Sequence, residues 1–118
     1  MKPNESYEGC VTNRGQVRHE LKTWPQEFTS VVNGSLRHEV RKNDRCFRVG
    51  DELLLREWNP LTGTYTGNTV LVRVTYLTTG EELFHQYDQG SGQFPDDLVV
   101  MSVKVENWLF QKRKGCEL

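Results

Sequence analysis

The chain has 118 residues, 36% of them hydrophobic and 26% charged, which suits one domain with a single core and is too short for two. Its formal net charge is −1, so no overall positive field would draw it to nucleic acid or to an anionic membrane. No stretch approaches the roughly 18 apolar residues that span a bilayer, and residues 1–10 lack the apolar run of a signal peptide, so we expect a cytoplasmic protein without membrane contact.

The chain begins with a segment of little periodicity. Residues 1–17 are polar and interrupted by glycines, which predicts a flexible N-terminal arm. A domain is expected over residues 18–105, and residues 106–118 form a C-terminal extension that is interpreted as a short docked helix. Within the domain, His19–Lys22 is typical of a short strand.

A short amphipathic helix is expected next. Thr23, with Gln26 three residues later and Pro25 between them, predicts a threonine cap and a proline in the first turn. The apolar residues of this helix follow the i, i+3, i+4 spacing, and Gly34 predicts its end; they are Phe28, Val31 and Val32.

The period then changes to two, which predicts strands. Residues 36–41 alternate between a mostly apolar face and a fully charged one. Val49–Asp51 indicates a turn before a strand at 52–58. The remaining segments are expected to be a long loop made of 59–63 and 66–68, a strand at 69–78, a second long loop at 80–97 and a closing strand at 98–105.

One early helix and five or six strands favour a mainly β, α+β architecture. We expect a small, mostly antiparallel β-barrel with the short helix at its edge.

The charged residues concentrate between Arg37 and Arg48. This segment has five basic and two acidic residues, a local charge of +3 in a chain of −1. It is the basic patch on which any contact with phosphate groups would depend.

Several motifs in a fixed order resemble a known family. They are H-E-L-K (19–22), E-V-R-K-N-D-R (39–45), F-R-V-G-D (47–51), L-R-E-W (55–58), V-R-V-T-Y (72–76) and V-V-M-S (99–102). Together they resemble the small bacterial and phage domains of unknown function in the ASCH group of the PUA-like superfamily. The resemblance implies a PUA-like β-barrel with a cleft beside the helix and a role related to RNA.

The family signature, G-x-K-x-x-E-x-R, falls on Gly34, Leu36, Glu39 and Arg41, so that leucine replaces the lysine. Some small proteins of the ASCH group that this chain resembles are amidohydrolases, which deacylate N4-acetylcytidine with that lysine, a threonine at the position of Glu39 and a downstream glutamate. Because this chain lacks the lysine and the threonine, binding is favoured over catalysis, and Glu39 would be the catalytic base only if an activity is present.

We therefore expect an RNA- or nucleotide-binding module with a charged cleft. Arginine and lysine side chains would bind phosphate oxygens, Glu39 would accept hydrogen bonds from a base edge, and Trp24 or Trp58 would stack on a base. The candidate ligand-binding residues are Lys22, Trp24, Arg37, Glu39, Arg41, Lys42, Asn43 and Arg45. The alternatives are a solvated strand face on which Glu39 pairs with Arg37 and Arg41, and tryptophans that belong to the core.

Two further hypotheses about the function of the whole protein stay open. One is an amidohydrolase acting on acylated or modified nucleosides, and the other is a phage or mobile-element accessory protein that binds a host protein through loop 80–97 and the tails. The oligomeric state is left open.

Neither a metal nor a cofactor is expected. The three histidines, His19, His38 and His85, have no ligand spacing with one another or with Cys46. Three widely spaced cysteines argue against a disulfide framework, and Asp96 and Asp97 are expected to end a loop.

Overall fold

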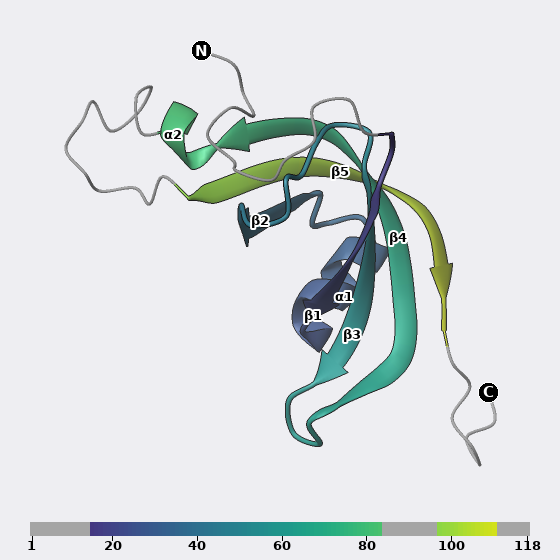
Figure 1. Cartoon of the computed structure of the whole chain (residues 1–118). Helices are drawn as coiled ribbons and strands as arrows, with labels where there is room; N and C mark the ends of the chain where they lie inside the picture. Colours follow the sequence, from purple (N-terminus) through teal and green to yellow (C-terminus); the bar gives the residue numbers. More distant parts are fainter. Residues whose placement is uncertain (1–14, 84–96, 111–118) are drawn as a thin grey trace.

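The computed structural model describes residues 15–83 and 97–110, which form a curled five-stranded sheet with a helix against its concave side (Figure 1). The predicted arm lies outside the described residues except for 15–17, which have no regular structure. The elements in chain order are β1 (Arg18–Thr23), α1 (Pro25–Val32), β2 (His38–Lys42), β3 (Glu52–Asn59), β4 (Thr64–Thr79), α2 (Gly80–Leu83) and β5 (Leu98–Leu109).

The strand order in the sheet is β1-β3-β4-β5-β2. The mainly β, α+β class with a short helix is therefore confirmed, but the sheet is not antiparallel throughout, because β1 pairs with β3 in parallel. Strands β1 and β2 stand at the two ends of the sheet, which curls into a half-barrel and brings these two edges toward each other. Sheet twist and the long, bent β4 and β5 allow this curling.

Helix α1 lies inside the curve of the sheet and packs against β3, β4 and β5. Phe28 and Val31 are buried, as their spacing predicts, and burial of such side chains contributes about 1.5–3 kcal/mol each. Gly34 has a φ of 86°, and its N–H donates to the carbonyl of Val31 at 3.1 Å, so the predicted helix end is confirmed.

The predicted threonine cap is wrong. Trp24 occupies the N-cap position without a side-chain hydrogen bond to the helix, and Thr23 belongs to β1. Proline at the start of the helix requires no N–H partner, so the helix begins without the threonine.

The segment 59–68 is not one long loop. A short turn ends where β4 begins at Thr64, and Thr66–Asn68 form an irregularity in β4 opposite Glu57. The Glu57 carboxylate accepts hydrogen bonds from Thr66 Oγ1 and Asn68 Nδ2, both at 2.9 Å. The turn-forming residues therefore belong to a bulge within a strand, and Gly67 supplies its φ of 95°.

The C-terminal strand is longer than predicted. β5 continues to Leu109, so residues 106–109 are strand where a short docked helix was expected, and 111–118 lie outside the described residues.

The predicted loop 80–97 begins with α2, whose Glu82 N–H donates to Thr79 Oγ1 at 3.1 Å while Glu82 Oε1 accepts from the Thr79 N–H at 2.9 Å. The rest of this loop, 84–96, including Asp96, is outside the described residues.

The core lies between α1 and the concave side of the sheet. It consists of Leu21, Phe28, Val31, Phe47, Leu53, Leu55, Val70, Val72, Val74, Val99, Met101 and Val103. Neither helix of the described residues has the length and apolar character that crossing a membrane would require.

Candidate functional site

Two arginines join the edges of the half-barrel. Arg41, on β2, donates through its guanidinium to the carbonyl of Lys22 at 3.0 Å and to Thr23 Oγ1 at 3.4 Å. Arg45, just after β2, donates to the carbonyl of Glu20 at 2.8 Å. These contacts satisfy carbonyls on the open edge of β1, which would otherwise need water, and they hold β2 next to β1.

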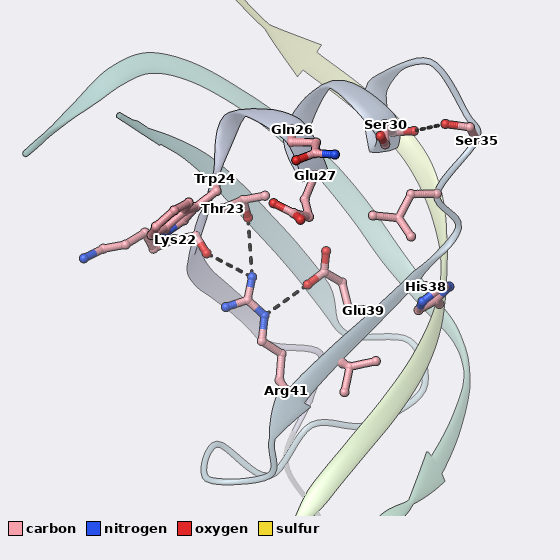
Figure 2. Close-up of a pocket in the computed structure, with 12 residues that line it drawn as sticks. Lys22, Thr23, Trp24, Gln26, Glu27, Ser30, Ser35, His38, Glu39 and Arg41 are labelled. Atoms are coloured by element: carbon pink, nitrogen blue, oxygen red, sulfur yellow. Dashed lines mark hydrogen bonds and ion pairs between the residues drawn. The ribbon is translucent and has the colours of Figure 1, made fainter. Parts of the chain in front are cut away.

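A pocket of about 640 Å³ lies where the end of β1, the polar side of α1 and β2 meet (Figure 2). The side chains that line it are those of Lys22, Thr23, Trp24, Gln26, Glu27, Ser30, Ser35, Leu36, His38, Glu39, Val40 and Arg41. Of the predicted ligand-binding residues, the structure therefore brings Lys22, Trp24, Glu39 and Arg41 together in one cavity.

Glu39 is turned inward from β2, toward this pocket. Its side chain is 6% exposed, whereas the neighbouring Val40 is 49% exposed, so the strand is not solvated at Glu39 as the alternative supposed. The pairing of Glu39 with Arg41 that this alternative also named is present, and Arg37 on the same row is exposed. A buried carboxylate requires a partner, and Arg41 Nε provides one at 3.0 Å from Glu39 Oε1.

Burial raises the pKa of Glu39 above its ordinary value of 4.5. The charge and the hydrogen bond of Arg41 act in the opposite direction, and the nearby Glu27 adds to the increase. Glu39 thus holds a proton more readily than an exposed glutamate, a common property of carboxyl groups at functional sites.

Trp24 is available at the rim of the pocket, because 56% of it is exposed. Lys22 also lines the pocket, but its ammonium group is placed 3.9 Å from the centroid of the Trp58 ring, where a cation–π contact holds it. Trp58 in turn packs edge-on against Tyr65, with 4.9 Å between ring centroids. Trp58, the second candidate for stacking, therefore has one face occupied by Lys22 and lies outside the pocket.

A second, smaller cavity of about 170 Å³ adjoins the first. It is lined by Leu21, Arg41, Lys42, Asp44, Arg45 and Phe47. Arg41 lines both cavities and forms their shared wall. Lys42 and Arg45, predicted to act together with Arg41, are thus close to the main pocket but on the other side of this wall.

Arg37 and Asn43, the remaining predicted ligand-binding residues, line neither cavity. Arg37 Nε donates to the carbonyl of Gly34 at 2.9 Å, which ties the strand to the helix end, and Glu39 pairs with Arg41 rather than with Arg37. Asn43 is buried, and its N–H donates to the carbonyl of Asp97 at 2.6 Å, where β2 ends beside β5. Both positions are thus explained by contacts that shape the fold.

The histidines of the described residues do not form a metal site. His19 Nε2 is 2.8 Å from the buried carboxylate of Asp51, and its ring packs against Phe47. Asp51 also accepts the N–H of Arg48 at 3.0 Å, so it closes the turn before β3. Within 15–83 and 97–110, no three histidine, cysteine or acidic residues are grouped for a metal, and His85 is outside this range.

Cys46 is disulfide-bonded, contrary to the expectation drawn from the number and spacing of the cysteines.

Sequence reasoning missed the contribution of α1 to the pocket. Gln26, Glu27 and Ser30 of the helix line the pocket beside β2, whereas Phe28 and Val31 are buried in the core. The signal was present in the sequence, because an amphipathic helix beside a cleft must present its polar side to that cleft.

The fold and the pocket define a small α+β domain in which a half-barrel, a helix and two bridging arginines enclose a polar cavity. Residues 18–103 match the family described as a domain of unknown function (DUF3850), which is most of the chain, and the protein belongs to this family. It is also 38% identical over 69 residues to an uncharacterized 12.9 kDa protein in the GpA 3′ region of Escherichia phage P2. That alignment covers 58% of this chain and 62% of the phage protein, so the chain spans less than two thirds of the relative's length.

Proposed function

We propose that this domain binds a nucleotide, either free or as part of an RNA strand. The base occupies the larger pocket, where Glu39 accepts hydrogen bonds from the base edge and Trp24 stacks on the base. The phosphate lies toward the smaller cavity, where Lys42 and Arg45 supply positive charge.

The observation that carries this proposal is the position of Arg41 between the two cavities. On one side of Arg41 lies a pocket with a buried carboxyl group, which accepts hydrogen bonds. On the other side lies a cavity with two further cationic side chains, Lys42 and Arg45, and one acidic side chain, Asp44. A nucleotide has the matching polarity, because its base edge presents donors and its phosphate is an anion.

We also propose that the domain belongs to the ASCH group of the PUA-like superfamily, and the role related to RNA that this resemblance implies agrees with the proposed function. Three positions of its signature have distinct places here: Gly34 ends α1, Glu39 lies in the pocket and Arg41 bridges to β1. Leu36, at the position of the signature lysine, lines the same pocket, so the substitution changes the pocket surface itself.

The test is a titration of the protein with nucleosides and with their 5′-monophosphates at several salt concentrations. Monophosphates should bind more tightly than nucleosides, and their affinity should fall with salt. Lys42→Gln should weaken the binding of monophosphates without changing the affinity for nucleosides. It should also reduce the slope of log affinity against log salt concentration by about 1.

Lys104→Gln, which removes the same charge from an exposed position on β5 outside both cavities, is the matched control and should leave binding unchanged. Absence of binding to every nucleotide and to a short single-stranded RNA would refute the proposal. Tighter binding of the RNA than of the mononucleotides would indicate that the strand is the natural ligand.

A second candidate is the amidohydrolase, and the raised pKa of Glu39 is the observation that favours it. A carboxyl group whose pKa is raised takes up and returns a proton more readily than an exposed glutamate, and Ser30 and Thr23 bring hydroxyl groups to the same pocket. Incubation with N4-acetylcytidine should then yield cytidine and acetate, and Glu39→Gln should abolish the reaction. A rate equal to that of the buffer alone would exclude this activity on this substrate.

A further inference from the structure

Two carboxyl groups face each other inside the larger pocket. Figure 2 shows that Glu27, on α1, and Glu39, on β2, point toward one another across the cavity. Their proximity has an electrostatic consequence, because the charge of Glu27 contributes to the raised pKa of Glu39. The two side chains come from separate elements of the fold, so tertiary packing is what creates the pair.

Glu27 and Glu39 together have four carboxyl oxygens. In the part of the chain that the structure describes, only one of them has a hydrogen bond to a neighbouring side chain. Glu39 Oε1 accepts from Arg41 Nε at 3.0 Å. The remaining oxygens can accept hydrogen bonds from a bound molecule. This end of the pocket therefore presents mainly acceptors, and a suitable ligand must present donors to it.

On the basis of the nucleotide-binding function proposed above, we propose that Glu27 and Glu39 select bases with an exocyclic amino group and reject uracil. An amino group has two N–H bonds, so each carboxylate can accept one of them. Uracil presents a carbonyl oxygen where cytosine has its amino group, and two carboxylates facing that oxygen would repel it.

The rest of the pocket is consistent with this orientation. Trp24 offers an exposed ring at the rim, and Arg41, with the cations beyond it, lies away from α1, toward the second cavity. A base whose amino group lies between the two glutamates can thus direct its phosphate toward the arginine side. The arrangement combines base selection at one end with sequence-independent phosphate binding at the other.

The experiment compares cytidine 5′-monophosphate with uridine 5′-monophosphate, which differ in the base but share the sugar and the phosphate. The wild-type protein should bind the cytidine compound about tenfold more tightly or better, the discrimination typical of a well-formed polar contact to a base edge. Glu27→Gln should bring this ratio close to one, because an amide side chain also offers N–H donors to the carbonyl of uracil.

Glu20→Gln is the matched control, because it removes one acidic side chain from an exposed position on β1 that lines neither cavity. It should keep the wild-type ratio. Circular dichroism of both variants verifies that they fold, and Glu27 is exposed, so its replacement by glutamine should not disturb the core.

Equal affinity of the wild-type protein for the two monophosphates would overturn the proposed selectivity and leave nucleotide binding intact. A preference for cytidine that survives in Glu27→Gln would assign the selection to Glu39 or Trp24 and overturn the role of the pair. No binding of either compound would refute the proposed function itself, and the inference with it.

Discussion

Two glutamate–arginine pairs in this domain have similar geometry and opposite electrostatics. Glu39 and Arg41 meet at 3.0 Å beside the pocket, and Glu106 and Arg73 meet at 2.6 Å on the other side of the sheet. The pKa of Glu39 is raised because the carboxyl group is buried, whereas the pKa of Glu106 is lowered because it accepts a hydrogen bond from Arg73. The arginine contact is common to both, so the difference lies in access to solvent.

The second pair belongs to a row of charges that crosses the sheet. Arg73 also contacts Glu52 at 3.3 Å and the carbonyl of Gly50 at 2.9 Å, and Glu52 contacts Arg18 at 3.0 Å. This row links β1, β3, β4 and β5 through side chains that all keep partial access to water. Such networks support the sheet at little desolvation cost.

The comparison is consistent with the site proposed at Glu39 and Arg41. Glu39 places a carboxyl group in a buried position, where the sheet could have placed an apolar side chain, and burial penalises the charged form of that group. A costly charge beside a cavity is a feature that binding or catalysis explains better than stability does.

The largest effect is expected for Arg41→Ala. This change leaves the Glu39 carboxylate buried without its ion-pair partner and removes the contact of β2 with the carbonyl of Lys22. Loss of one partner from a buried pair costs about 3–5 kcal/mol. We expect the decrease in the free energy of unfolding to lie near the lower end of this range, because Glu39 can take up a proton. Urea denaturation at pH 7 measures it.

Arg73→Ala is the matching change in the exposed row and should cost less than Arg41→Ala, because water replaces the lost contacts. Arg37→Ala, on the same segment as Arg41 but outside both cavities, provides the control for loss of an arginine. If Arg73→Ala destabilised the protein more than Arg41→Ala, the distinction between the two pairs would be wrong.

A smaller, pH-dependent effect is expected for Glu39→Gln. Because the pKa of Glu39 is higher in the folded protein than the ordinary value of 4.5, its contribution to stability is fully present below 4.5 and is lost as the pH rises through the folded pKa. The variant has no such loss. Its stability relative to the wild type should therefore increase as the pH rises above 4.5, as measured by thermal or urea denaturation at each pH.

Arg41 remains in Glu39→Gln and can donate to the glutamine oxygen, so the expected change reflects ionisation more than lost contacts. A stability difference that stays constant from pH 4 to pH 8 would show that burial does not perturb Glu39.

Local patterns predicted the elements that form the scaffold of the site. The spacing of Phe28 and Val31 located α1, Gly34 located its end, and the β-branched run gave the centre of β4, because these features depend on neighbours in the sequence. The bulge at Thr66–Asn68 was missed, since a bulge and a turn use the same residue types.

The candidate site was harder to predict, because its contacts join distant residues. Residues 36–41 alternate between a mostly apolar face and a charged one, and this pattern does not predict that Glu39 is buried while Val40 is exposed. The acceptors of Arg41 and Arg45 are backbone carbonyls of β1, which have no signature in the sequence. Likewise, the position of Lys22 over Trp58 depends on the pairing of β1 with β3.

The smallest effect is expected for Glu106→Gln, with the opposite dependence on pH. The lowered pKa of Glu106 means that its contribution to stability is present above the ordinary value of 4.5 and is lost as the pH falls through the folded pKa. The variant should thus be slightly less stable than the wild type at pH 7, and the deficit should disappear on acidification. It should also shrink in 1 M salt, which screens exposed charges, whereas the pH dependence at Glu39 should persist there because buried pairs are screened less. A deficit in stability that grows on acidification would mean that burial, not Arg73, determines the pKa of Glu106. The pKa values of Glu106 and Glu39 would then be shifted in the same direction.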